Sequence, residues 1–283
     1  MNHKDGKLAK QIIDLQNEDG TWGLSFHSLS LPNKRHPLTT EQALRRLKAL
    51  GFTIQDAPVA KAVACMNSCL LGERRIDTYS EKSHNWELFT KLMLSAWVRI
   101  FDPENEPALA FAKRWATIIE KAFESGTYHN DAYLDAYQCE FSSKPRGPRE
   151  LDFSDFYHIH LLQGVLLQET EARMLDYIIA KPNGLYYVYG KALNTPPAVF
   201  ASKETSWYLA ALDVLSGYRS AKAKLGFAID WIEKNKDEHG QWDLGKDAKD
   251  GVNLPLSDSW RKPEYRKADC TERITDLLLK FSS

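Results

Sequence analysis

The sequence predicts an all-α fold, namely an α/α toroid of about five helical hairpins with an inner and an outer helix layer. Glycines recur at positions 20, 72, 126, 184 and 240, which are 52, 54, 58 and 56 residues apart. Each glycine follows an apolar stretch with helical spacing, and a second, more apolar helical stretch comes after it. Repeats of this length are typical of stacked helical units. Residues 1–283 are therefore predicted to form a single toroid domain.

The outer helix of each hairpin is predicted to end near its glycine. The apolar residues that mark these helices lie within 8–15, 69–71, 115–123, 174–179 and 227–232. Glycine adopts positive φ without strain and commonly follows the last turn of a helix. An aromatic residue stands two positions after four of the glycines, as Trp22, Tyr128, Tyr186 and Trp242. We expect these rings to fold back and cover the helix ends.

The inner helices are predicted within 39–50, 85–93, 154–165, 205–215 and 269–281, which are richer in apolar residues. Two of them begin with capping-box spacing, Thr39 with Gln42 and Asp269 with Glu272. The links from outer to inner helices are long, so they and the N-termini of the inner helices should meet at one end of the array. We expect any site at that end, because loops on a rigid scaffold carry variable chemistry.

A resemblance to a known superfamily supports this architecture. The string Q-N-E-D-G-T-W-G at 16–23, followed by T-x-x-A-L-x-x-L at 40–47, resembles the repeat of the prenyltransferase and terpene-cyclase superfamily. The resemblance implies an α/α toroid whose inner helices surround a central cavity for an isoprenoid or other apolar ligand. Family rings often have about six hairpins. With five, this ring is expected to be smaller, open, or closed by an irregular segment such as 131–141.

Two short strings resemble catalytic motifs of that superfamily. Asp269 opens the string D-C-T, which resembles the D-C-T-A-E string of oxidosqualene cyclases, whose aspartate protonates the substrate. Glu272 stands where that family has alanine, and a helix N-cap is the alternative role of Asp269. Asp155 and His158 belong to D-F-Y-H, which resembles the string of protein farnesyltransferase β subunits in which the histidine binds zinc.

No D-x-C string accompanies His158, so a tetrahedral zinc site lacks its remaining ligands and no bound metal is predicted. The candidate catalytic residues are therefore Asp269, His158 and Asp155. The alternative for His158 is a histidine at a helix start that pairs with Asp155. Cys65 and Cys69 are one helical turn apart, and their apolar neighbours favour burial over metal binding.

Aromatic residues near the starts of the inner helices are candidates for ligand binding. They are Trp86, Tyr157, Trp207 and Tyr208. In terpene cyclases such rings line the cavity and stabilise carbocations through cation–π attraction. Packing in the core is the alternative. The long loops carry basic clusters at 34–36, 74–75, 144–149 and 261–267 that can hold a diphosphate, in which case magnesium would accompany it. Otherwise no cofactor is predicted.

Composition excludes several classes of function. Lys plus Arg is 37 and Asp plus Glu is 38, so the charge gives no reason to expect nucleic-acid binding. No apolar run approaches the roughly 20 residues of a membrane span. Four cysteines without a C-x-x-C string, and no secretory signal, predict a cytoplasmic protein. Neither a P-loop nor a dinucleotide fingerprint is present. The sequence indicates no oligomeric state.

The leading hypothesis is a terpene-cyclase-like or prenyltransferase-like protein, a lyase, isomerase or transferase if it is an enzyme. The alternatives are a carbohydrate-active toroid, since paired carboxylates such as Asp131 and Asp135 can hydrolyse glycosides, and a non-catalytic interaction scaffold. An apolar cavity lined by Trp86, Tyr157 and Trp207 would favour the first. A cleft lined by carboxylates would favour the carbohydrate hypothesis, and a filled core the scaffold. We also expect Asp155, His158, Trp86, Trp207 and Asp269 to gather at one mouth.

Overall fold

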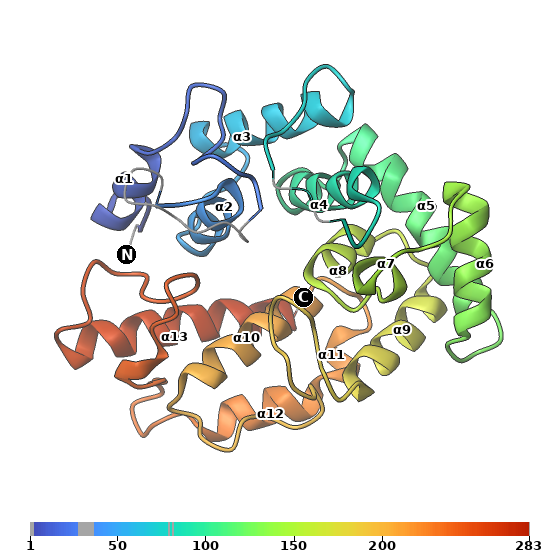
Figure 1. Cartoon of the computed structure of the whole chain (residues 1–283). Helices are drawn as coiled ribbons and strands as arrows, with labels where there is room; N and C mark the ends of the chain where they lie inside the picture. Colours follow the sequence, from blue (N-terminus) through green and yellow to red (C-terminus); the bar gives the residue numbers. More distant parts are fainter. Residues whose placement is uncertain (1–2, 28–36, 79, 81, 283) are drawn as a thin grey trace.

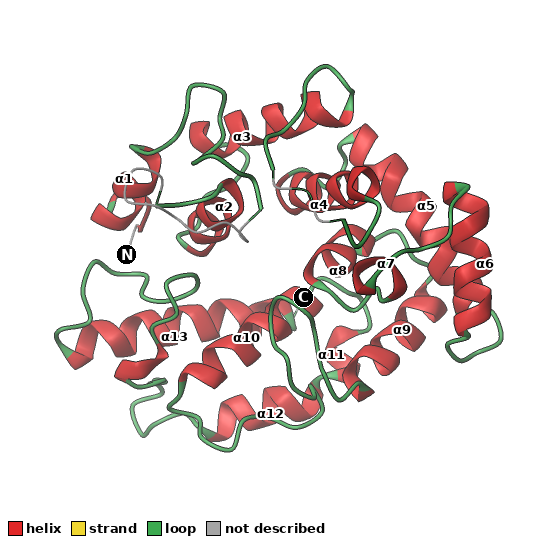
Figure 2. Ribbon diagram, viewed as in Figure 1, coloured by secondary structure: helices red, strands yellow, loops and turns green. Residues whose placement is uncertain are grey.

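The computed structural model describes residues 3–27, 37–78, 80 and 82–282. Throughout these ranges the chain forms helices and loops with no β-strand, and its β-type pairing consists of isolated bridges such as Gln16 with Trp22 (Figures 1 and 2). The all-α prediction is therefore confirmed. None of the described helices is long and apolar enough to cross a membrane.

Ten helices correspond to the five predicted hairpins. The predicted outer helices are α1 (Lys7–Ile13), α3 (Ala57–Leu70), α5 (Glu106–Ala122), α9 (Gln168–Ala180) and α12 (Gly226–Lys234). The predicted inner helices are α2 (Thr40–Ala49), α4 (Trp86–Phe101), α8 (Phe156–Leu162), α10 (Lys203–Leu215) and α13 (Pro263–Lys280). In Figure 1, α3, α5, α9 and α12 lie toward the rim, whereas α2, α4, α8 and α10 lie nearer the middle. Helix α13 packs against α10.

Burial distinguishes some of these helices. Every residue of α8 is buried, as are ten of the sixteen residues of α4. Helix α5, in contrast, is amphipathic: Phe111, Trp115, Ile118 and Ala122 form one buried stripe at intervals of three or four residues, with charged residues opposite. A helix that is apolar on most sides is stable only inside the protein, which accounts for the positions of α4 and α8. Helix α13 differs from the prediction of apolar inner helices, because only four of its eighteen residues are buried.

The five glycines all have positive φ, but some of them lie farther from the helix end than predicted. All five glycines have positive φ, between 55° and 101°. However, α1 ends at Ile13 and α12 at Lys234, so Gly20 and Gly240 lie six or seven residues beyond the helix. Each closes a separate turn, because the helix has already stopped before the glycine is reached. Gly72, in contrast, directly follows Leu71, the C-cap of α3, whereas Gly126 and Gly184 lie four residues beyond the ends of α5 and α9.

The tryptophans after two of these glycines fold back as expected. The indole nitrogen of Trp22 donates to the carbonyl of Ile12 at 2.7 Å, and that of Trp242 donates to the carbonyl of Ile232 at 2.8 Å. Both bonds span ten residues and end on a carbonyl in the last turns of the outer helix, where carbonyls lack partners within the helix. The first and last hairpins are thus built in the same way.

Side-chain caps start the inner helices in most cases. Thr39 forms the predicted capping box of α2, while Asn85 and Asp155 cap α4 and α8. Helix α10 begins earlier than predicted, with Ser202 as its cap in place of Thr205. In each case a side-chain oxygen accepts a backbone N–H that has no partner inside the helix.

The segment 131–141 is not irregular as expected, because residues 130–141 form helix α6 (Asn130–Phe141) on the outside of α5. Tyr133 and Tyr137 anchor it by donating to the backbone carbonyl and the carboxylate of Glu150, each at 2.7 Å. Glu150 belongs to the short helix α7 (Pro148–Leu151), and a second short helix, α11 (Ala221–Lys224), precedes α12. The 3-10 turns η1 (His3–Asp5) and η2 (Lys246–Ala248) complete the described elements.

The first and last hairpins touch each other. His3 in η1 bonds to the Glu272 carboxylate of α13 at 2.8 Å. The backbone N–H of Leu8 donates to Asp258 at 3.3 Å. Arg46 of α2 donates to the carbonyls of Val252, at 3.0 Å, and of Pro255. The beginning of the described chain is therefore tied to the loop and helix at its end.

Candidate functional site

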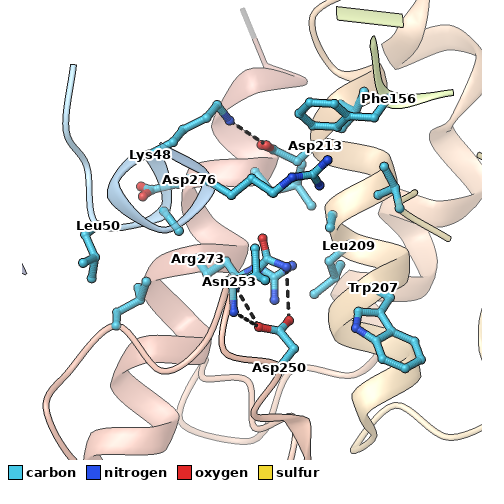
Figure 3. A pocket seen from close by; sticks show the side chains of 18 of the residues that line it. Lys48, Leu50, Phe156, Trp207, Leu209, Asp213, Asp250, Asn253, Arg273 and Asp276 are labelled. Atoms are coloured by element: carbon cyan, nitrogen blue, oxygen red, sulfur yellow. Dashed lines mark hydrogen bonds and ion pairs between the residues drawn. The ribbon is translucent and has the colours of Figure 1, made fainter. Parts of the chain in front are cut away.

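A cavity of about 730 Å³ lies among the predicted inner helices (Figure 3). All five of them contribute wall residues, whereas α1, α3, α5, α9 and α12 contribute none within the described ranges. The segments 187–190 and 250–256, the turn η1, and Leu50 and Gly51 after α2 complete the described lining. The volume lies within the roughly 300–1,000 Å³ typical of small-molecule sites.

The wall of the cavity is charged and aromatic. Among the described residues that line it, nine are Asp, Glu, Lys or Arg: Lys4, Arg45, Lys48, Asp213, Asp250, Glu272, Arg273, Asp276 and Lys280. Five aromatic residues join them: Trp97, Phe156, Tyr187, Tyr189 and Trp207. Charged side chains are rarely enclosed unless they are paired or serve a ligand, so this composition marks the cavity as a site for polar chemistry.

One ionic bridge joins three helices. The carboxylate of Asp213 on α10 receives Lys48 of α2 at 3.3 Å and Lys280 of α13 at 2.5 Å, one lysine on each oxygen. Burial by itself would raise the pKa of Asp213, but the two ammonium groups outweigh it and hold that pKa well below its usual range. Two positive charges thus share one negative charge.

Arg45 lies one helical turn before Lys48. Its guanidinium stacks over the ring of Phe156, 3.8 Å from the centroid, and donates to Glu41 at 3.0 Å. His160 lines the same part of the cavity, and its ring lies 4.6 Å from that of Phe156. Burial, aided by the positive charge of Lys48, lowers the pKa of His160 to about 3, so the imidazole is neutral at physiological pH.

Asp276 differs from the other acidic residues of the cavity. It is exposed to the cavity and makes no hydrogen bond or ion pair with any residue that the structure describes. Partial burial, together with Glu272 one helical turn away, raises its pKa. Asp276 therefore presents to the cavity a carboxyl group that no described residue occupies.

The far side of the cavity is held by Arg273 and Asp250. Arg273 donates to the hydroxyl and to the backbone carbonyl of Ser206, both at 2.6 Å, and the same hydroxyl donates to Asp250 at 2.6 Å. Asp250 also accepts the amide group of Asn253 at 3.1 Å (Figure 3). Trp207, next in sequence to Ser206, also lines the cavity and is 43% exposed, and the ammonium group of Lys203 lies 5.3 Å from its ring centroid.

A buried polar network supports one wall of the cavity. The Glu41 carboxylate accepts Tyr157 at 2.9 Å and contacts His27 at 2.9 Å. The other nitrogen of His27 contacts the hydroxyl of Tyr187 at 3.1 Å. Tyr187 has a φ of 67°, which side chains other than glycine rarely adopt, and it lines the cavity. The network therefore holds a strained wall residue in place.

The structure places Asp155 and His158 away from the cavity. Asp155 caps α8 and contacts the ring of His158 at 2.8 Å. His158 is completely buried, and its ring meets that of Trp115 edge-on with centroids 4.4 Å apart. The pairing of His158 with Asp155 is the alternative that the sequence left open.

Asp269 is not a helix cap. Helix α13 begins at Pro263 after Lys262, so Asp269 lies in its second turn. Its carboxylate is buried and accepts the backbone N–H groups of Leu256 and Ser257 at 2.8 and 2.9 Å. The expected capping box with Glu272 is therefore wrong, because both residues lie inside the helix. Asp269 instead fixes the loop beside the cavity.

Of the candidate binding residues, Trp207 lines the cavity and the other three do not. Trp86 packs against Phe89, with ring centroids 5.4 Å apart. Tyr157 belongs to the buried network around Glu41. Tyr208 is fully buried and donates to the carbonyl of Leu193 at 3.0 Å. The five residues expected at one mouth are therefore not brought together there.

The charged wall residues were not among the predicted site residues, although the sequence carries a signal for them. Arg45 and Lys48 are three residues apart, as are Arg273 and Asp276, so each pair shares one helix face. Such stripes usually face solvent, so they were not among the predicted site residues.

Of the basic loop clusters, 34–36 lies outside the described residues. The clusters at 74–75 and 261–267 form ion pairs with acidic side chains of the fold, as Arg74 does with Asp19.

Within the described ranges, no group of three or more His, Cys, Asp or Glu side chains is arranged to hold a metal ion. Cys65 is buried and Cys69 half-buried on α3, while Asp131 and Asp135 are exposed on α6.

Comparisons of the chain with protein-family models, with curated proteins and with solved structures find no match. The cavity is therefore interpreted from its own chemistry.

Proposed function

We propose that this protein binds a carbohydrate in the cavity between its inner helices. The observation that carries the proposal is the wall itself, where four carboxylates surround a space that also exposes the ring of Trp207. Carboxylates, guanidinium groups and amides are hydrogen-bonding partners suited to the many hydroxyls of a sugar. The apolar face of a sugar ring packs on an aromatic ring. An isoprenoid chain offers no partner to these charges and would leave them desolvated.

Asp276 is the residue that we propose as the acid if the protein cleaves its ligand. Glycoside hydrolysis requires one carboxylic acid that protonates the leaving oxygen and a second carboxylate on the other side of the bond. Asp276 carries a raised pKa, whereas that of Asp213 is lowered. Carboxyl groups whose pKa values are pushed apart in one cavity are the usual sign of such a division of roles.

We further propose that the hairpins form the α/α toroid expected from the resemblance to the prenyltransferase and terpene-cyclase superfamily. The equivalent Trp22 and Trp242 bonds, and the contact of His3 with Glu272, support a ring of repeats. A prenyl diphosphate remains the second candidate ligand. It is favoured by the position of Lys48 and Lys280 near the aromatic ring of Phe156, which suits a phosphate joined to an apolar chain.

Native mass spectrometry and calorimetry with both ligand classes test the proposal. The intact protein should bind oligosaccharides more tightly than it binds farnesyl diphosphate. Trp207→Ala should weaken sugar binding roughly tenfold, because one lost aromatic contact is worth about 1 kcal/mol or more. Phe227→Ala, which removes an exposed ring from α12 outside the cavity, is the matched control. Binding of the diphosphate alone would refute the carbohydrate proposal.

If oligosaccharides are cleaved, Asp276→Asn should abolish turnover while leaving binding nearly intact. The amide keeps the size of the side chain but has no acidic proton. An Asp276→Asn protein with undiminished turnover would remove Asp276 from the proposed acid role.

A further inference from the structure

We propose that the carbohydrate carries an anionic group, and that Arg45, Lys48 and Lys280 bind it. These three cations, together with Asp213 and Phe156, form what we term the cationic subsite. The inference rests on the proposed function, since it specifies the substrate class of the same cavity. It depends on how these cations are grouped around Asp213 and Phe156, which the carbohydrate proposal does not use.

The two lysines of the subsite keep unused hydrogen-bond donors. An ammonium group has three N–H donors, and Lys48 and Lys280 each use one on Asp213. Glu41 pairs with Arg45, and Asp276, one helical turn before Lys280, interacts electrostatically with that lysine and with Asp213. An acidic group on the ligand would accept hydrogen bonds from the remaining donors of both lysines.

The three cations of the subsite are held in place before a ligand binds. Arg45 cannot swing freely, because Glu41 holds one end of its guanidinium and the ring of Phe156 covers its face at 3.8 Å. Lys48 and Lys280 come from α2 and α13 and are drawn toward each other by the carboxylate of Asp213 on α10. Cations fixed before binding lose little entropy when a ligand arrives, so an anion binds them more tightly than it binds mobile lysines.

His160 lines the same space as the three cations. Burial and the positive charges of Lys48 and Arg45 lower its pKa, whereas Asp213 and a hydrogen bond with Gln163 oppose that shift. The imidazole is therefore neutral at physiological pH and adds no charge to the subsite. A ring nitrogen that Gln163 does not engage can bond to a sugar hydroxyl beside the anionic group. The subsite can therefore hold both parts of an acidic sugar.

Calorimetry on the full chain with three probes of equal length tests the inference: a neutral gluco-oligosaccharide, an oligogalacturonide and a phosphorylated gluco-oligosaccharide. We expect at least one acidic probe to bind roughly tenfold more tightly than the neutral one in low salt, and the difference to shrink as salt screens the charges. The carboxylate and phosphate probes separate the two sources of anionic charge.

Lys48→Met and Lys280→Met should each remove most of the preference for the acidic probe, measured as the ratio of acidic to neutral affinity within the same variant. Lys48→Arg should retain the preference, which separates loss of charge from loss of fold. Lys222→Met on α11, an exposed lysine outside the cavity, is the control. Neutral and acidic probes bound equally well by the unaltered protein would overturn this inference but not the carbohydrate proposal. A protein that binds none of the probes would overturn both.

Discussion

The indole nitrogen of Trp260 donates to the carboxylate of Asp269 at 2.6 Å. The same oxygen accepts the hydroxyl of Ser257 at 2.8 Å and two backbone N–H groups of the same loop. One buried side chain thus attaches residues 256–260 to α13. Since Leu256 lines the cavity, Asp269 shapes the site without facing the ligand.

Asp269→Ala should destabilise the protein by about 3 kcal/mol or more, because several buried donors lose a charged acceptor at once. Asp269→Asn should cost less, since the amide oxygen still accepts. The exposed Asp276 on the same helix provides the control, and Asp276→Asn should change stability by no more than about 0.5 kcal/mol. Chemical denaturation of the three variants measures this. Equal stability of Asp269→Ala and the unaltered protein would contradict the role assigned here.

The equivalent hydrogen bonds of Trp22 and Trp242 predict equivalent costs. Trp22→Phe and Trp242→Phe each leave a carbonyl near the end of an outer helix without its indole donor and open a small void. We expect each to lower the free energy of unfolding by about 1–3 kcal/mol. Trp207→Phe should be nearly neutral, because that ring is exposed. A large loss in one buried variant and none in the other would argue against structurally equivalent hairpins.

Gly184 and Gly126 both have positive φ, but only Gly184 lies close to other backbone atoms. Replacing each with alanine therefore distinguishes the cost of backbone strain from the cost of steric crowding. A Cβ atom at Gly184 would lie 2.2 Å from the carbonyl oxygen of Lys191, whereas at Gly126 it would meet open space. Gly126→Ala should therefore cost only about 1–2 kcal/mol of backbone strain. Gly184→Ala should cost clearly more, because the backbone itself has to move. Thermal denaturation of the two variants compares them, and equal costs would refute the close approach at Gly184.

Glu41 predicts a specific loss of stability in acid. Burial opposes its ionisation, but Arg45 and His27 outweigh burial and lower its pKa from 4.5 to about 2. A carboxyl group whose pKa is lower in the folded state stabilises the fold above its unfolded pKa. That contribution is lost as the pH falls from about 4.5 toward 2.

Glu41→Gln should thus cost on the order of 3 kcal/mol at neutral pH, because it leaves a broken buried pair. Its stability should also fall less steeply than that of the unaltered protein between these pH values. Denaturation curves recorded from pH 7 to pH 2 measure both effects. Two parallel pH profiles would show that Glu41 does not carry the predicted linkage.

The starts of α2, α4 and α8 could be predicted because helix caps are local properties. Thr39, Asn85 and Asp155 start helices through their own side chains, and their neighbours in sequence suffice to show this. The predicted start of α13 at Asp269 was wrong, because capping-box spacing also arises by chance inside a helix. The proline at 263, a residue favoured in the first turn, was the better signal.

The cavity could not be predicted in the same way, because its residues meet only after folding. Lys48 and Asp213 are 165 positions apart and lie near the ends of their helices. The predicted site residues, in contrast, lie near the predicted starts of the inner helices. A charged stripe has the same spacing whether it faces solvent or an internal space, so the pattern alone does not separate the two cases.

The contact between His3 and Glu272 affects how the protein unfolds. In an open stack of repeats, each terminal unit has a neighbour on one side only and frays before the middle. Here the first described turn contacts the last helix, so the first and last hairpins support each other. In the toroid that we propose, loss of any one hairpin would remove support from two others. We therefore expect the five hairpins to melt together in one cooperative transition, unlike the gradual unravelling of a linear array.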